Sequence, residues 1–296
     1  MIALDTIVFS DGEGGGNPCP LLFDYGDLST EKMLSMTQYF GYESLFISES
    51  SLEDTNYKFR YFVPNHEMEM CVHATVAGAT FLVRHNLVRE NTIQIETLLG
   101  KITVHWRKDD EHSILITVNQ FSPIFSENNP SKKEVAKCLN TKEENIVTTD
   151  YPIQSVSTSR PKLIIPIKND EELHKLKPDF KALWHVCERY NTTGFYPFSI
   201  HTKDKNYDFE ARQFPNNVGY NEDSATGVAA CALGAYLTEY SKNVNFNAKE
   251  IGIGQGKAIH KPSKIIVKTS KFENQITTAV SGYAQIIGKK TVPEFL

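Results

Sequence analysis

The sequence predicts an α+β protein of two similar domains, each a mostly antiparallel, barrel-like sheet wrapped around a central α-helix. Short segments that alternate polar and apolar residues dominate the chain, which is typical of antiparallel strands. Two other segments consist almost wholly of small or apolar residues, as in helices that are buried on all sides. These two segments lie in stretches that resemble each other at one fixed spacing, and such self-similarity indicates duplicated structural units.

Four dipeptides mark the repeat. Pro64-Asn65 is followed ten residues later by Ala74-Thr75, and Pro215-Asn216 is followed ten residues later by Ala225-Thr226. A strand-like stretch precedes each proline, and a small-residue helix follows each threonine. Two copies of this kind predict two domains rather than a solenoid, and a cleft between two such halves is a natural place for a ligand.

The first domain is predicted over residues 1–118. Ser29 is expected to cap a helix that runs through Phe40, and Gly41 is expected to end it in the left-handed conformation. The buried helix is expected over residues 74–83. We interpret the remaining segments as strands, at residues 2–9, 44–48, 57–63, 92–96, 101–106 and 113–118.

The second domain is predicted over residues 119–284, because the stretch 119–130 is rich in Asn, Ser and Pro and suits a domain boundary. Ser131 and Glu134 form a capping-box pattern that opens a short helix, and an acid-capped helical region follows, up to Glu188. The second buried helix is expected over residues 225–240. Strands are predicted at residues 163–167, 194–201, 207–214, 251–253, 264–269 and 276–287.

Composition narrows the classes of function. With 296 residues, 40% of them hydrophobic, the chain can build two cores. A net charge of −5 and scattered basic residues argue against nucleic acid as a partner. No apolar run reaches the roughly 18 residues that span a bilayer, and the first residues carry no basic segment. We therefore expect no signal peptide, no membrane association and a cytoplasmic protein.

Neither a metal nor a cofactor is expected. Five cysteines, an odd number without a C-x-x-C pair, suggest neither a disulfide framework nor a zinc knuckle, and they fit a reducing compartment. His66, Cys71 and His73 match no common metal site in their spacing. Gly14-Gly15-Gly16 is neither a dinucleotide-binding loop nor a phosphate-binding P-loop.

The N-termini of the two buried helices are the first candidate site. The free N–H groups and the partial positive charge of such an end favour an anion. If the two halves face each other, the ends near Thr75 and Thr226 can point into one cleft and hold a carboxylate or an enolate without a metal. The alternative is that both are buried structural helices with ordinary caps.

Titratable residues flank both helix ends. His73 precedes Ala74-Thr75, and Glu222-Asp223 precedes Ser224-Ala225-Thr226. Taken separately, an acid beside a helix end is most often a cap, and a lone histidine is most often a structural residue. At equivalent places of two copies, they instead suit a facing pair of hydrogen-bonding or acid/base groups.

Glu43 breaks the symmetry of the repeat. Looser matching aligns Gly41-Tyr42-Glu43 with Gly194-Phe195-Tyr196, so that a tyrosine takes the place of the acid in the second copy. The apolar segment Leu45-Phe46-Ile47 follows Glu43, and partial burial would suit its carboxyl group to moving protons near neutral pH. The alternative is a surface glutamate at a helix–strand turn.

Five motifs in a fixed order span nearly the whole chain. They are G-G-N-P at residues 15–18, Y-E-S-L-F at 42–46, C-V-H-A-T at 71–75, A-R-Q-F with E-D-S-A-T-G-V-A at 211–214 and 222–229, and Q-G with K-P-S at 255–256 and 261–263. In these motifs the chain resembles the PhzF-like isomerase family known from phenazine biosynthesis, within the diaminopimelate epimerase-like superfamily.

The resemblance implies an active site between the two domains and a final strand, at about residues 285–296, that returns to the first domain. It also implies a cofactor-independent isomerase in which one glutamate shuttles a proton on a cyclic hydroxy-diene amino acid, helped by a histidine and an aspartate. On this chain these residues are Glu43, His73 and Asp223. A small carboxylate-bearing substrate would contact Asn17, Val72, Ala74, Thr75, Ser224, Thr226 and Gly227.

Three residues depart from the family pattern. Val72 replaces a glycine, Ser224 a common proline and Val228 a common serine. Valine keeps the N–H group, but its β-branched side chain narrows the pocket and disfavours positive φ. Activity on the phenazine precursor is therefore not assumed.

Two other functions stay open at this point. One is a single-carbon epimerase or racemase, in which Cys71 would be a second acid/base group; the other is a catalytically silent protein that binds a small ligand. A homodimer is conceivable for a chain with two similar halves, although the sequence shows no decisive interface patch.

Overall fold

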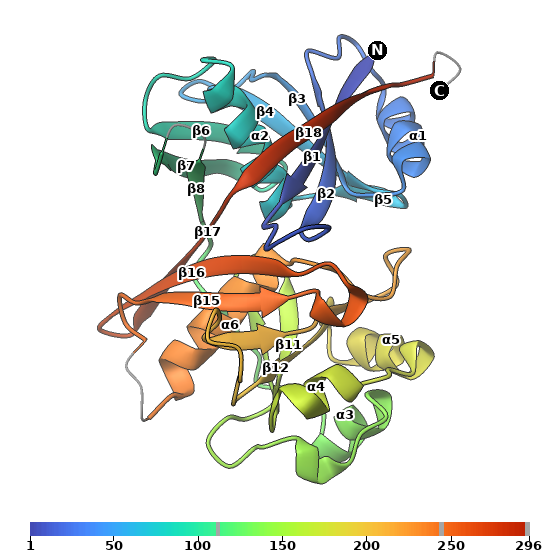
Figure 1. The fold of residues 1–296 in the computed structure, drawn as a ribbon, viewed down its shortest axis with the longest axis vertical. Helices are drawn as coiled ribbons and strands as arrows, with labels where there is room; N and C mark the ends of the chain where they lie inside the picture. The colour runs from blue at the N-terminus through green and yellow to red at the C-terminus, as the bar shows by residue number, and fades with distance from the viewer. Residues whose placement is uncertain (111–112, 243–245, 294–296) are drawn as a thin grey trace. The chain divides into compact units, whose positions relative to one another are not determined.

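The computed structural model describes residues 1–110, 113–242 and 246–293. The chain forms two compact units, one of residues 1–10, 16–119 and 281–296 and one of residues 11–15 and 120–280 (Figure 1). Both are α+β units, as the sequence predicts, with a sheet around one buried helix. Within the described ranges no helix combines the length and the apolar character needed to cross a membrane.

In the first unit the sheet begins with three neighbouring strands. β1 (Ile2–Val8) pairs antiparallel with β2 (Asn17–Phe23) on one side and with β18 (Ala284–Thr291) on the other. The helix α1 (Thr30–Phe40) then carries the chain to β3 (Ser44–Glu49), which lies parallel to β2. The chain thus needs an outer helix at this point, because two parallel strands cannot be joined by a hairpin.

The rest of this sheet surrounds the helix α2 (Val72–Arg84), which links a second parallel pair. β4 (Tyr57–Val63) is antiparallel to β3 and parallel to the strand that follows α2. That strand is β6 (Thr92–Thr97), which is antiparallel to β7 (Gly100–Lys108). β7 is in turn antiparallel to β8 (Ile114–Asn119), and β5 (His66–Met68) is antiparallel to β4.

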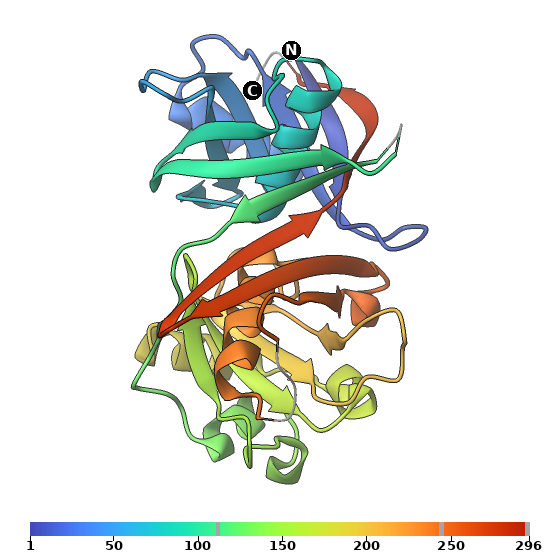
Figure 2. The same ribbon diagram turned by 90° about the vertical axis from the view of Figure 1, so that its left-hand side faces the viewer.

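Helix α2 is buried at every residue from Val72 to Val83, which confirms the prediction from its composition. In Figure 2 the ribbon of this helix lies among the strands of the first unit. Because Gly78 has no side chain, neighbouring strands can approach the helix axis closely. A Cβ atom at Gly78 would lie 2.6 Å from the Leu45 side chain and 2.7 Å from the ring of Phe59. The apolar residues of β3 and β4 therefore pack directly on the helix backbone.

Helix α1 has the predicted ends. The side chain of Ser29 accepts a hydrogen bond from the backbone N–H of Lys32, and Gly41 has φ 76°, in the left-handed region. These caps fix where the helix stops, so Tyr42 and Glu43 form a short turn immediately before β3.

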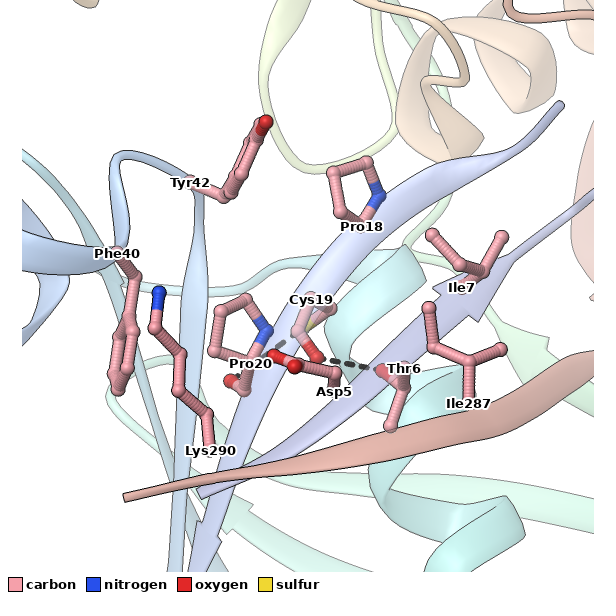
Figure 3. A pocket seen from close by; sticks show the side chains of 10 residues that line it. All are labelled: Asp5, Thr6, Ile7, Pro18, Cys19, Pro20, Phe40, Tyr42, Ile287 and Lys290. Atoms are coloured by element: carbon pink, nitrogen blue, oxygen red, sulfur yellow. Dashed lines mark hydrogen bonds between the residues drawn. The ribbon is translucent and has the colours of Figure 1, made fainter. Parts of the chain in front are cut away.

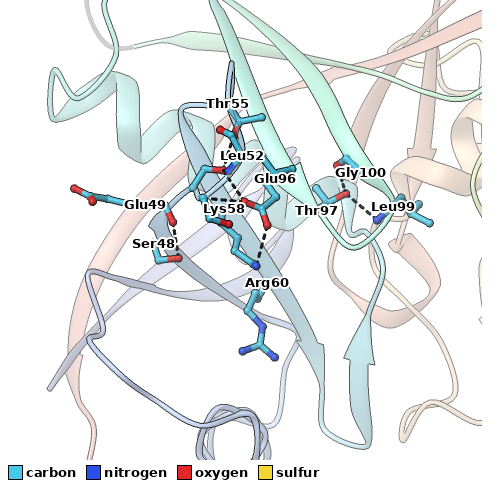
Figure 4. A network of polar contacts seen from close by, with 12 residues as sticks. Ser48, Glu49, Leu52, Thr55, Lys58, Arg60, Glu96, Thr97, Leu99 and Gly100 are labelled. Carbon is cyan, nitrogen blue, oxygen red and sulfur yellow. Dashed lines mark hydrogen bonds and ion pairs between the residues drawn. The ribbon is translucent and has the colours of Figure 1, made fainter.

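A polar cluster ties the outer strands of the first unit together (Figure 4). Glu96 on β6 is 8% exposed and forms an ion pair with Lys58 on β4 at 2.8 Å. Its other oxygen accepts hydrogen bonds from the Ser50 hydroxyl at 2.6 Å and from the Ser51 N–H at 3.3 Å. Burial alone raises the pKa of Glu96, but these donors outweigh it and lower the pKa overall.

The second unit repeats this order. β10 (Gln154–Ser157) pairs antiparallel with β11 (Pro161–Ile167) and with β9 (Ile124–Phe125). An outer helical segment then leads to β12 (Gly194–Ser199), which lies parallel to β11. The outer helices of this unit are α3 (Lys132–Cys138), which has the predicted capping box, α4 (Asp170–Lys175) and α5 (Phe180–Arg189).

The buried helix α6 (Gly227–Tyr240) links the next parallel pair. That pair consists of β13 (Phe209–Ala211) and β15 (Glu250–Gln255). β12 pairs antiparallel with β13 and with β14 (Phe214–Pro215), and β15 pairs antiparallel with β16 (Ser263–Phe272). Short 3-10 helices lie at Glu143–Asn145 and Lys257–Ile259. The two units therefore share one topology.

Two long predicted strands are interrupted. The segment 207–214 forms β13 and β14 with a gap opposite Pro197, which has no N–H to donate, although Arg212 still donates to the Pro197 carbonyl at 2.9 Å. The segment 276–287 forms β17 (Gln275–Gly282) and β18, and the two strands separate at Tyr283. There Gly282 leaves room for the ring of Phe9, which a Cβ atom would approach to 2.2 Å.

Candidate functional site

Glu43 is held at the end of the turn that follows α1. Its side chain is only 12% exposed, because β3 continues at once into buried residues. Glu43 therefore lies at the helix–strand turn, but its carboxyl group is largely shielded from solvent. Its neighbour Tyr42, in contrast, is 46% exposed.

The imidazole of His73 lies beside this carboxyl group. A carboxylate oxygen of Glu43 is 3.5 Å from Nε2 of His73, whose side chain is 5% exposed. A protein N–H···O hydrogen bond has a typical length of about 2.9–3.0 Å, so this contact is loose. The two groups can attract each other electrostatically, yet neither is locked in place by the other.

Cys71 contacts the same ring. Its Sγ atom lies 3.2 Å from Nδ1 of His73, and the residue is buried. Cys71 is the N-cap of α2, but its side chain makes no capping hydrogen bond. The thiol therefore lies beside the imidazole. Its sulfur atom is also 3.9 Å from Nε2, the ring nitrogen that contacts Glu43.

Cys19 on β2 lies close enough to Glu43 to sense its charge. Burial, and to a lesser extent the charge of Glu43, raise the pKa of the Cys19 thiol well above its ordinary value. This cysteine consequently stays protonated at neutral pH. It also lines a cavity of about 260 Å³ in the first unit, together with Thr6, Pro20, Tyr42 and Lys290 (Figure 3). Glu43 and His73 do not line that cavity.

The other candidate residues of the first unit lie around the start of α2, except Asn17. Val72, Ala74 and Thr75 belong to its first turns and are at most 2% exposed. The Thr75 hydroxyl bonds the Cys71 carbonyl at 2.8 Å and contacts the Tyr61 hydroxyl at 2.8 Å. Asn17 is 4% exposed and opens β2.

Val72 fits its position without strain. It is the first residue of α2 and is not among the residues with positive φ. Valine is thus compatible with this backbone, and the difficulty expected from its β-branched side chain does not arise there. Its side chain is buried and adds apolar surface at the helix end.

In the second unit, Asp223 and Thr226 are joined by a hydrogen bond. The Thr226 hydroxyl donates to Oδ2 of Asp223 at 2.5 Å, and the backbone N–H of Asp223 donates to the Gln213 carbonyl at 3.1 Å. Ser224 is 4% exposed, and Gly227 is the first, buried residue of α6. Asp223, Ser224, Thr226 and Gly227 therefore gather at one helix end.

The two helices begin at different points of the repeat, which corrects the sequence-based expectation that both begin near the matched threonines. Helix α2 begins at Val72, so His73 and Thr75 lie inside it, and the Thr75 N–H already donates to the Cys71 carbonyl. Helix α6 begins only after Thr226. Asp223 instead belongs to an isolated bridge with Gln213. A helical residue in one unit thus corresponds to a non-helical one in the other.

Sequence reasoning assigned no role to Gln255 or Tyr196 in binding or catalysis. Gln255 is 1% exposed and bonds the Asp223 carbonyl, Thr226 and the hydroxyl of Tyr196. The available signal was the Q-G motif, since a polar residue at the end of a buried strand needs partners. Among the described residues, no group of three or more histidine, cysteine or acidic side chains is arranged to hold a metal ion.

Known proteins resemble this chain over nearly its whole length. Residues 7–289 match the family described as phenazine biosynthesis-like protein, PhzC-PhzF. The uncharacterized isomerase YfhB of Bacillus subtilis is 30% identical over 279 residues, which cover 93% of each chain. The uncharacterized isomerase YddE of Escherichia coli is 29% identical, over 92% of this chain and 91% of the relative.

A solved structure has the same fold throughout. The PhzF-family phenazine biosynthesis protein of Bacillus anthracis superposes with a TM-score of 0.90 at 25% identity, over 99% of both chains. The family match, the relatives and this superposition confirm the resemblance seen in the sequence motifs. The curated relatives above are named isomerases, and this chain is an enzyme of that class. The chain belongs to the phenazine biosynthesis-like (PhzC-PhzF) family.

Proposed function

We propose that this enzyme is a cofactor-independent isomerase that moves a proton between two carbon atoms of a small carboxylate-bearing substrate. Glu43 takes the proton from one carbon and returns it to another on the same face. The loose contact between Glu43 and His73 at 3.5 Å is the observation that carries the proposal. A shielded carboxyl group beside an imidazole, without a rigid hydrogen bond between them, suits repeated proton exchange.

His73 and Asp223 are proposed to bind the polar groups of the substrate and to assist the rearrangement of the product. The backbone N–H groups at the start of α2 and α6 would hold a carboxylate or a developing negative charge. Asn17, Val72, Ala74 and Thr75 would contribute contacts from the first domain, and Ser224, Thr226 and Gly227 from the second. One general acid/base group contributes roughly 10²–10⁴ in rate, so these contacts must supply the remainder through positioning.

The proposal requires both domains to bind one substrate. We place the first domain at residues 1–118, with a strand at about 285–296, and the second at residues 119–284. The division into two compact units supports this assignment. We further propose that the substrate occupies an interdomain cleft, which would bring Asp223 to the group that Glu43 and His73 act on.

The test is proton exchange with solvent. The enzyme, dialysed against a chelator, is incubated in D2O with cyclic unsaturated hydroxy acids and amino acids, and the products are followed by mass spectrometry and NMR. The proposal predicts isomerisation with solvent deuterium at one new carbon position and no dependence on added metal. A compound can instead raise the unfolding temperature of the protein by binding to it. If every such compound is neither isomerised nor labelled with deuterium, the protein binds a small ligand without catalysing a reaction.

The contact between Cys71 and His73 at 3.2 Å favours a second candidate, a single-carbon epimerase or racemase. An adjacent imidazole can accept the thiol proton and make the sulfur a base. Inversion at carbon needs such a group on each face of the substrate. Cys71→Ala separates the two candidates, because it should abolish epimerisation but leave a Glu43-dependent isomerisation with measurable turnover.

A further inference from the structure

The amide of Gln255 is saturated with hydrogen bonds at the start of α6. Its Oε1 atom lies 3.0 Å from the Tyr196 hydroxyl and 3.3 Å from the backbone N–H of Thr226. Its Nε2 atom lies 2.9 Å from the backbone carbonyl of Asp223 and 3.1 Å from the Thr226 hydroxyl. An amide offers two donors and two acceptor sites, and all four are used here.

Two backbone groups fix which way this amide points. The Thr226 N–H can only donate, so it must face the oxygen of Gln255. The Asp223 carbonyl can only accept, so it must face the nitrogen. The flipped amide would place two donors against each other on one side and two acceptors on the other, which would leave buried polar groups unsatisfied.

The orientation of the amide then fixes the direction of the hydroxyl hydrogen bonds. Tyr196 must donate to Oε1, and its fully buried hydroxyl retains its proton because burial and the nearby charge of Asp223 both raise its pKa. The Thr226 oxygen accepts from Nε2, so its own proton is directed at Oδ2 of Asp223, 2.5 Å away. Oδ2 is therefore a hydrogen-bond acceptor.

We infer that Gln255 and Thr226 are positioning residues that direct the Thr226 hydroxyl proton at Oδ2 of Asp223, so that this hydrogen bond orients the Asp223 carboxyl group and favours its ionised form. This inference rests on the role proposed above for Asp223 and deepens it. Gln255 acts through Thr226, and Thr226 acts through Asp223. Neither needs to touch the reacting carbon atoms.

Thr226→Val and Thr226→Ser form a matched pair for testing this. Valine has nearly the same shape without the hydroxyl group, whereas serine keeps the hydroxyl group. The Thr226 side chain makes no capping hydrogen bond to the helix backbone, so valine removes no cap. The measurement is ¹³C NMR of aspartate-labelled protein without ligand, with the Asp223 carboxyl signal assigned by its loss in Asp223→Asn.

In Thr226→Val, the titration midpoint of the Asp223 signal should move upward by about one pH unit relative to the parent, because a hydrogen bond to a charged group is lost. Thr226→Ser should titrate like the parent. An unchanged midpoint in the valine variant, or an equal shift in the serine variant, would overturn the inference.

Gln255→Glu is a second, independent variant of nearly the same size. It replaces the Nε2 donor by an acceptor, so the new carboxylate at position 255 and that of Asp223 compete for the hydroxyl proton of Thr226. The titration midpoint of the Asp223 signal should therefore rise again. No rise would contradict the placement of the Gln255 side chain beside the Asp223–Thr226 pair. None of these titrations uses a substrate. If no deuterium is incorporated, the proposed reaction is refuted, but the titration of Asp223 is unaffected. If the titration does not change as expected, the inference about Gln255 and Thr226 is refuted, but the proposed reaction is not.

Discussion

His73 presents Nε2 to the carboxyl group of Glu43 at 3.5 Å and Nδ1 to Sγ of Cys71 at 3.2 Å. The shorter of the two contacts is the one with the thiol, whose sulfur atom also lies 3.9 Å from Nε2. An imidazole that contacts a thiol can still exchange a proton with a carboxyl group at 3.5 Å. This arrangement suits a residue that must pick up a proton, move it and release it.

Gly78→Ala tests the close packing around α2. Alanine favours a helix over glycine by about 1 kcal/mol, but its Cβ atom would overlap Leu45 and the ring of Phe59. We expect the steric overlap to outweigh the gain in helix propensity, so that the free energy of unfolding falls by roughly 1–3 kcal/mol. Urea unfolding measures this. Adding Phe59→Leu should recover part of the loss, and a more stable Gly78→Ala protein would show that the helix is loosely packed.

Glu96→Gln tests the polar cluster of the first unit. The folded-state pKa of Glu96 lies below its unfolded value, so its contribution to stability exists above about pH 4.3 and is lost as the pH falls through the folded value. At pH 7 we expect a loss of about 1–3 kcal/mol in the free energy of unfolding. The difference in the free energy of unfolding between the parent and Glu96→Gln should shrink steadily below pH 4. Glu90→Gln, at an exposed position, is the control and should follow the parent throughout.

Glu222→Gln tests the ion pair that precedes Asp223. Arg212 donates two hydrogen bonds to Glu222, at 2.9 and 2.7 Å, and both side chains are less than 10% exposed. Removal of the negative charge leaves a buried guanidinium without its counter-charge, which should cost about 3–5 kcal/mol. Thermal unfolding measures the loss.

The matched control is Glu171→Gln. Glu171 forms an exposed ion pair with Lys175 on α4, and solvent screens such pairs strongly. Its replacement should leave the unfolding midpoint where it is. Equal midpoints for the two variants would mean that the Arg212–Glu222 pair does not anchor this segment.

The sequence predicted the features that depend on residues close together in the chain. Ser29 and Gly41 give both ends of α1, and the small apolar residues of α2 and α6 predict helices buried on all sides. The predicted start of α2 was two residues too late, because its N-cap Cys71 makes no side-chain capping bond and so carries no sequence signal.

Features that depend on tertiary contact could not be read from the sequence in the same way. Glu43 and His73 meet only after a helix, a strand pair and a turn have folded, and no periodicity gives their separation. The partners of Gln255 come from two other elements of the second unit. Duplication in the sequence points to equivalent segments, but the different starts of α2 and α6 show that equivalent residues need not have the same conformation.

The most direct test of the proposed mechanism is the rate of solvent-deuterium incorporation by Glu43→Gln compared with Glu49→Gln, an exposed position at the other end of β3. With any compound that the parent enzyme isomerises in D2O, the Glu43 variant should lose roughly 10²–10⁴ of the rate, while the Glu49 variant keeps the parent rate. Incorporation at the parent rate by Glu43→Gln would contradict the account.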